Sequence, residues 1–118
     1  MSQQQGVGSL ADAFLSFSRT GTGTAYTVPT ANEGAAPPIL PTTTLVKSIY
    51  ISNETGGAVT TTVAAVDSSA TVTTELYKES MADGAQLQLL DQPIVLEKAD
   101  TLNLTGAGIK ILVSVMEI

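Results

Sequence analysis

Short runs of alternating apolar and polar residues, separated by turn residues, constrain the fold of this chain more than any other feature. A period of two residues places every second side chain on the same face of a β-strand. The last run is the clearest example, because Ile109, Ile111, Val113 and Val115 all fall on one face. Runs of this kind between glycines, prolines and aspartates are typical of strands joined by tight turns.

The runs follow one another at short and even spacing. The expected strands cover residues 25–28, 45–53, 58–66, 71–78, 86–90, 93–96, 101–105 and 109–117. Gly56 and Gly57 can supply the positive φ of a hairpin turn, and Asp67 favours a turn by bonding to nearby backbone groups. The chain has 118 residues, the length of a single domain. The pattern therefore predicts an all-β fold, a single β-sandwich or jelly-roll-like domain of about seven or eight strands.

The N-terminal third differs from the rest of the chain in charge and proline content. Residues 1–44 hold four of the five prolines but only three charged side chains, Asp12, Arg19 and Glu33. Prolines cannot sit in a central strand, and a terminal segment of this kind is typically extended. We therefore expect an extended N-terminal arm with a Pro/Gly-rich loop over residues 1–43, followed by a β-sandwich domain over residues 44–118.

Residues 9–18 of this arm allow two interpretations. Ser9 and Asp12 resemble a capping box and are followed by apolar residues at helical spacing, whereas a strand over residues 13–18 fits almost as well. An arm that holds both phenylalanines of the chain must bury them against its own domain or against a neighbouring chain. Both alternatives stay open for the six candidate interface anchors, Leu10, Phe14, Leu15, Phe17, Ile39 and Leu40.

The composition excludes several classes of chemistry. The chain has no histidine and no cysteine, and so lacks the commonest general base, the commonest metal ligand and any thiolate. Most aspartates of the C-terminal part fall in expected turns, where they bond to the backbone, which leaves a calcium site built from turn carboxylates as the one metal-binding alternative. We expect no catalytic, cofactor-binding or metal-binding residues, and no enzymatic activity.

The charge and hydropathy also limit the partners. A formal net charge of −6 with five basic residues disfavours binding to nucleic acid and to anionic membranes. Neither a membrane-spanning apolar stretch nor a secretory segment is recognisable, so we expect synthesis in the cytoplasm. Threonines such as Thr60, Thr62, Thr71 and Thr73 give one strand face a neutral polar surface. That face is either solvated or an interface, since an uncharged face is desolvated at lower cost than a charged one.

Several segments have a family resemblance. They are TAYTVP at 24–29, TLVKSIYISN at 44–53, AVTTTVAAVDSSA at 58–70, LQLLDQPIVLEKADTLNL at 87–104 and VSVMEI at 113–118. In sequence and spacing they resemble small virion structural proteins of tailed bacteriophages, in which a Tyr-Thr-Val-Pro strand precedes a Val-Lys-Ser-Ile strand. The resemblance covers about residues 24–118. The proline-rich loop over residues 30–41 is longer than expected for that group.

The resemblance implies an all-β, non-enzymatic building block of a phage particle, made in the host bacterial cytoplasm and located in the virion. A capsid decoration (cement) protein would bind the major capsid protein or neighbouring virion subunits as a symmetric homo-oligomer, a trimer or a ring. A neck, collar or tail component is the alternative within the same class. A carbohydrate-binding module, using exposed Tyr50 and Tyr77, is the alternative from another class.

Overall fold

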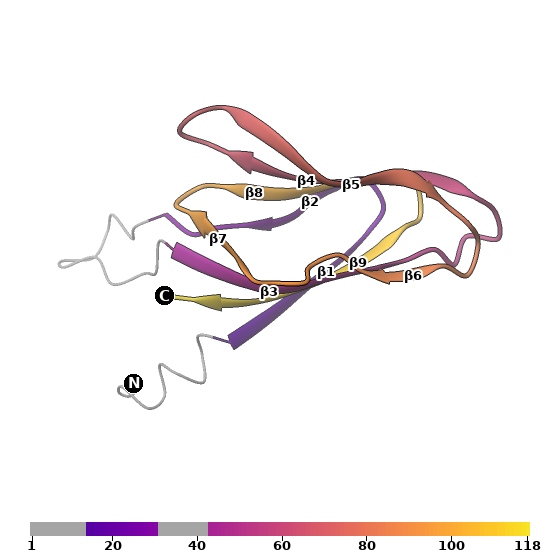
Figure 1. Cartoon of the computed structure of the whole chain (residues 1–118), viewed down its shortest axis with the longest axis horizontal. Helices are drawn as coiled ribbons and strands as arrows, with labels where there is room; N and C mark the ends of the chain where they lie inside the picture. Colours follow the sequence, from indigo (N-terminus) through magenta and orange to yellow (C-terminus); the bar gives the residue numbers. More distant parts are fainter. Residues whose placement is uncertain (1–13, 31–42) are drawn as a thin grey trace.

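The computed structural model describes residues 14–30 and 43–118, which form nine β-strands in two layers (Figure 1). The strands are β1 (Phe14–Thr20), β2 (Gly23–Thr27), β3 (Thr43–Ser52), β4 (Val59–Asp67), β5 (Val72–Met81), β6 (Gln86–Gln88), β7 (Ile94–Glu97), β8 (Thr101–Thr105) and β9 (Lys110–Glu117). Within these two ranges, no helix is long and apolar enough to cross a membrane.

All strand pairs are antiparallel, and the strands divide into two sheets. Sheet A has the order β1-β9-β3-β6, and β7 pairs with β3 on the same side as β6. Sheet B has the order β2-β8-β4-β5. Figure 1 shows sheet B above sheet A, which is the layered arrangement of a β-sandwich. The predicted fold class is therefore confirmed.

The strand pattern read from the sequence agrees closely with the structure. Each of the eight expected strands overlaps an observed strand, from β2 through β9. The ninth strand, β1, decides between the two interpretations of residues 9–18. Over the described part of that segment the strand is correct and the helix is wrong, because Phe14 to Thr20 pair in register with β9.

The core is aliphatic and lies between the inner faces of the two sheets. Val46, Ile49, Val113 and Val115 of sheet A are fully or almost fully buried, as are Leu102 and Leu104 of sheet B. Burying one such side chain stabilises the fold by about 1.5–3 kcal/mol, so the alternating inner positions hold the layers together. This agrees with a composition that contains no tryptophan and few other aromatic residues.

Two strands of the expected arm belong to the sheets. β1 pairs with β9 at one edge of sheet A, and β2 pairs with β8 at the corresponding edge of sheet B. Tyr26 and Val28 are buried in the core, with 4% and 0% of their surfaces exposed. The boundary expected at residue 43 stays a prediction, and residues 1–13 and 31–42 of the expected arm lie outside the described residues.

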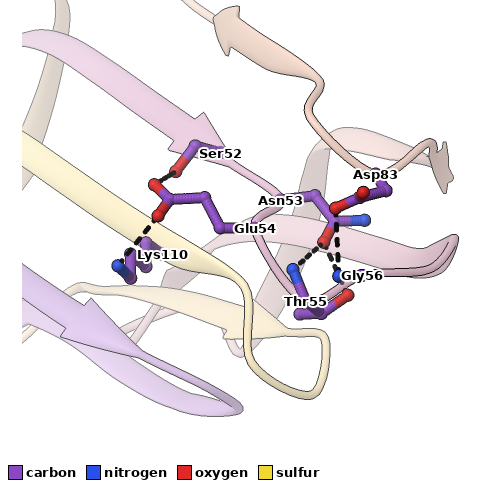
Figure 2. Close-up of polar contacts among 7 residues, drawn as sticks. All are labelled: Ser52, Asn53, Glu54, Thr55, Gly56, Asp83 and Lys110. Carbon is purple, nitrogen blue, oxygen red and sulfur yellow. Dashed lines mark hydrogen bonds and ion pairs between the residues drawn. The ribbon is translucent and has the colours of Figure 1, made fainter.

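The loop between β3 and β4 is fixed by side-chain bonds to neighbouring loops (Figure 2). The buried Asn53 donates from Nδ2 to the carbonyl oxygens of Gly57 and Met81, both at 2.9 Å, and accepts at Oδ1 from the backbone and hydroxyl of Thr55. Asp83 Oδ1 accepts from the backbone N–H of Gly56 at 3.0 Å. These bonds attach the loop to β5 and to the β5–β6 turn.

Candidate interaction surface

The outer face of sheet A carries a row of apolar side chains that crosses four strands. Phe14 on β1 lies opposite Met116 on β9, Met116 lies opposite Leu45 on β3, and Leu45 lies opposite Val95 on β7. Phe14 is 48% exposed and Val95 is 62% exposed, while the two central residues are half-buried. Directly opposite residues of neighbouring strands contact one another, so this row is one continuous apolar strip.

Uncharged polar residues continue the same face. A second row consists of serines on β1, β9 and β3, namely Ser16, Ser114 and Ser48. A third row places the exposed Leu112 beside the half-buried Tyr50, with Ser18 and Gln88 on either side. The face therefore combines hydroxyl groups with exposed apolar groups, the composition expected of a surface that can be desolvated at low cost.

Two shallow hollows lie on this face. One, of about 540 Å³, is lined by Phe14, Leu15, Ser16, Lys47, Ser48, Ser114 and Val115. The other, of about 330 Å³, is lined by Ser18, Arg19, Thr20, Tyr50, Ser52, Lys110, Ile111 and Leu112. Neither lining contains a carboxylate, whereas three of the five basic residues of this acidic chain line one hollow or the other. These two hollows therefore carry no negative charge of their own, and the exposed Glu97 lies at the edge of the face, on β7 in the same outward phase as Val95.

The basic residues of the face are held by specific contacts. Lys47 follows Val46 at an irregularity in the β3–β9 register, and its Nζ lies 5.1 Å from the centre of the Phe14 ring. A cation at this distance from an aromatic ring is attracted to the ring face. Lys110 Nζ lies 3.2 Å from Glu54 Oε1, and the two form an exposed ion pair (Figure 2).

The outer face of sheet B is different in character. Thr24 and Thr27 on β2, Thr101 and Thr105 on β8, and Thr60, Thr62 and Thr73 on β4 and β5 give it a threonine surface. The only ion pair described on it, Lys78 Nζ to Glu75 Oε2 at 3.8 Å, is exposed. Thr71 lies in the turn before β5, with φ at 54°, and so stands apart from the other expected threonines.

The candidate anchors that the structure describes lie on two different faces of β1. Phe14 points to the outer face, opposite Met116. Leu15 and Phe17 point inward and pack against the core, and the Phe17 ring lies 4.8 Å from the Tyr26 ring. Leu10, Ile39 and Leu40 lie outside the described residues. Whether any of the six anchors binds a partner stays a prediction.

Sequence reasoning missed the other apolar residues on the outer face of sheet A. Met116 and Leu112 point outward from β9, although the inward-pointing residues of this strand are already apolar. Apolar residues on both faces of one strand were the sequence feature that could have indicated an exposed apolar surface. Leu45 and Val95 give no such signal alone, because their strip forms only when β3 pairs with both β7 and β9.

The tyrosines proposed for a carbohydrate site lie on different sheets. Tyr50 is on β3 of sheet A and lines the smaller hollow, whereas Tyr77 is on β5 of sheet B and packs against the core. Burial and the nearby Glu79 raise the pKa of Tyr77. No group of three acidic residues close enough to hold a metal ion occurs in residues 14–30 and 43–118.

Comparison with known proteins gives little further information. No family model matches the chain, and no curated protein matches it. Among solved structures, the chain is similar to a crystal structure described as a pentameric capsid protein isolated from metagenomic phage sequences, with 15% identity and a TM-score of 0.40. The alignment covers 91% of this chain and 64% of that chain, so this chain spans less than two thirds of its length.

Proposed function

We propose that this protein is a non-enzymatic structural protein of a tailed-phage virion, and that it decorates the capsid as a symmetric homo-oligomer. Its partners are the major capsid protein or neighbouring virion subunits. The sequence resemblance over residues 24–118 suggests the class. The observation that carries the proposal is the outer face of sheet A, with its apolar strip, its serine row and its lack of carboxylates in the hollows.

The physical basis of binding is desolvation of this face. Exposed side chains such as Val95 and Leu112 gain by leaving water, at about 25 cal/mol per Å² of apolar surface. The neighbouring serines are neutral, so their burial needs hydrogen bonds but no charge compensation. Aromatic anchors such as Phe14 contribute most when they enter a pocket of the partner. An apolar capsid patch that offers hydrogen-bonding groups to the serines would complement this face.

A binding experiment with capsids tests the proposed face. Capsids that lack this protein are incubated with the purified chain and sedimented, and the bound fraction is measured. Val95→Lys and Leu112→Lys each place a charge on the outer face of sheet A, and each is expected to weaken binding by at least about tenfold. The matched control Thr60→Lys places the same charge on the outer face of sheet B and is expected to bind like the unmodified chain. If Val95→Lys and Leu112→Lys bind capsids as well as the unmodified chain does, this face is excluded.

The copy number in purified virions tests the location. Quantitative mass spectrometry is expected to give a ratio to the major capsid protein that is near one or a simple fraction of one. A ratio that corresponds to a single ring would favour a neck, collar or tail component instead. Absence from the particle would overturn the proposal.

One observation supports a second candidate function, carbohydrate binding. The smaller hollow combines the Tyr50 ring with hydroxyl groups and the basic side chains of Arg19 and Lys110. Aromatic rings can pack on the apolar face of a sugar while polar groups bind its hydroxyls. A glycan array tests this function, and binding that is lost in Tyr50→Ala and kept in Tyr77→Phe would support it.

A further inference from the structure

The sandwich has two lateral sides that differ in charge. β1 and β2 are joined by a short turn and contact each other through Phe17 and Tyr26, so they form one lateral side, here called the β1–β2 side. β5 is the last strand of sheet B, and β6 and β7 lie at the far edge of sheet A. These three strands form the opposite side, here called the β5–β7 side.

The charges of the two sides are complementary. Residues 14–27, which form the β1–β2 side, contain one charged residue, the exposed Arg19. Residues 72–97, which form the β5–β7 side, contain five exposed carboxylates and one lysine. The carboxylates are Glu75, Glu79, Asp83, Asp91 and Glu97. When one side of a molecule is positive and the opposite side is negative, the positive side of one copy attracts the negative side of the next. This favours head-to-tail association.

Arg19 is held in a defined position on the β1–β2 side. Its Nε donates to the carbonyl oxygen of Gly21 at 3.0 Å, and its terminal nitrogen donates to the carbonyl oxygen of Thr22 at 2.6 Å. The guanidinium group lies so close to Gly23 that a side chain at that position would overlap it. A guanidinium group has five N–H donors, so donors remain available for a carboxylate of another molecule.

Glu79 occupies the equivalent position on the β5–β7 side. Arg19 is on edge strand β1 opposite the buried Ile111, and Glu79 is on edge strand β5 opposite the buried Thr61. Each charged side chain therefore lies in the inward-facing phase of an edge strand while remaining exposed at the side of the sandwich. By contrast, Glu75 lies in the outward phase and already pairs with Lys78.

The edge of β1 also lacks the features that usually prevent strand association. Among the described strands, β5 carries several charges and a register irregularity, β2 is irregular, and β6 and β7 are short. β1 pairs with β9 at seven consecutive positions without irregularity and has one charged residue. Charges, irregularities and short strands protect sheet edges from pairing with other chains, so β1 is the least protected edge described.

We propose that copies of this chain associate head to tail, with the β1–β2 side of one copy against the β5–β7 side of the next and Arg19 facing Glu79 of the neighbouring copy. Such a heterologous contact uses a different surface on each partner and closes into a ring when the rotation between copies permits. The inference deepens the proposed function, since it names the contact within the homo-oligomer. It is tested on purified protein without capsids, so its failure leaves the capsid-binding experiment unaffected.

Charge exchange provides the test. Sedimentation velocity and native mass spectrometry of the full chain at low ionic strength are expected to show self-association that weakens as salt is added. Arg19→Glu and Glu79→Lys are each expected to weaken self-association by at least about tenfold, because like charges then meet. The double variant Arg19→Glu/Glu79→Lys is expected to recover it. An equimolar mixture of the two single variants is also expected to recover it, because copies that alternate along the assembly bring opposite charges together at every contact.

The controls carry the same charge changes elsewhere. Lys47→Glu on the outer face of sheet A and Glu54→Lys in the loop between β3 and β4 are expected to leave self-association within about twofold. Unchanged melting temperatures of all variants would show that the fold is retained. The proposal is overturned by a full-length chain that stays monomeric at millimolar concentration, by single variants that associate normally, or by association that appears only after residues 1–13 are removed.

Discussion

The hydroxyl group of Tyr26 lies 2.6 Å from Glu117 Oε2 and joins β2 of sheet B to β9 of sheet A. A phenol has one proton, which Tyr26 donates to Glu117, so the Thr44 hydroxyl at 2.7 Å must donate to the phenol oxygen. Thr44 is fully buried on β3. These two bonds link three strands from distant parts of the chain and attach β2 to the centre of sheet A.

Tyr26→Phe is expected to destabilise the protein by about 1–3 kcal/mol, because it leaves the buried Thr44 hydroxyl without this partner. Urea unfolding followed by circular dichroism measures the change in free energy. Tyr50→Phe is the matched control, since Tyr50 is half-buried on the outer face, and it is expected to change the stability by less than about 0.5 kcal/mol. Equal effects of the two variants would show that the Tyr26 bonds add nothing to stability.

Stability is expected to fall in alkaline solution because the Tyr26 hydroxyl is buried and hydrogen-bonded. Burial and the bond to Glu117 raise the pKa of Tyr26 well above its ordinary value of 10.0. Above pH 10 the unfolded chain loses this proton while the folded chain keeps it, so the free energy of unfolding decreases as the pH rises. The decrease from this group is at most about 1.4 kcal/mol per pH unit.

Urea unfolding at a series of pH values above and below 10 measures this dependence. Tyr26→Phe is expected to have a smaller slope than the unmodified chain. Tyr77→Phe is the control, because the pKa of Tyr77 is raised in the same direction but without a bond to Glu117. If Tyr26→Phe keeps the full slope, another group controls the alkaline transition.

Asn53→Ala is expected to lower stability by about 2–3 kcal/mol, because it removes two donated bonds to carbonyl oxygens and leaves buried groups unpaired. Asn103→Ala is the matched control. The Oδ1 atom of Asn103 is buried without a hydrogen-bond partner among the described residues, so its loss is expected to cost less. Thermal unfolding of both variants gives the comparison, and a larger effect at Asn103 would contradict the role assigned to Asn53.

The positions of the strands could be predicted from the sequence because alternation is a local property. The choice between helix and strand at residues 14–18 could not, since Phe14 and Phe17 fit the helical period while Leu15 and Phe17 fit the strand period over so short a segment. Pairing with β9, which is almost a hundred residues away in the chain, decided it. A tertiary contact of this kind overrides local preference.

The candidate surface shows the same limit. Leu112 and Met116 stand out in the sequence as apolar residues in the outward phase of a strand. The alignment of Met116 with Phe14, Leu45 and Val95, and of Leu112 with Tyr50, depends on the order of strands within sheet A, which alternation does not specify. The partners of Tyr26 were equally hidden, because Glu117 lies 91 positions further along the chain.

Truncation tests how far the N-terminal strands are needed for folding. A fragment of residues 44–118 lacks Tyr26 and Val28, and it leaves β8 and β9 without the strands that pair with them at the edges of the sheets. Losing these two buried side chains alone costs about 3–6 kcal/mol, a large part of the stability of a small domain. We expect this fragment to show no cooperative thermal unfolding, whereas a fragment of residues 14–118 should unfold cooperatively. A cooperative transition in the shorter fragment would instead support the domain boundary predicted at residue 43.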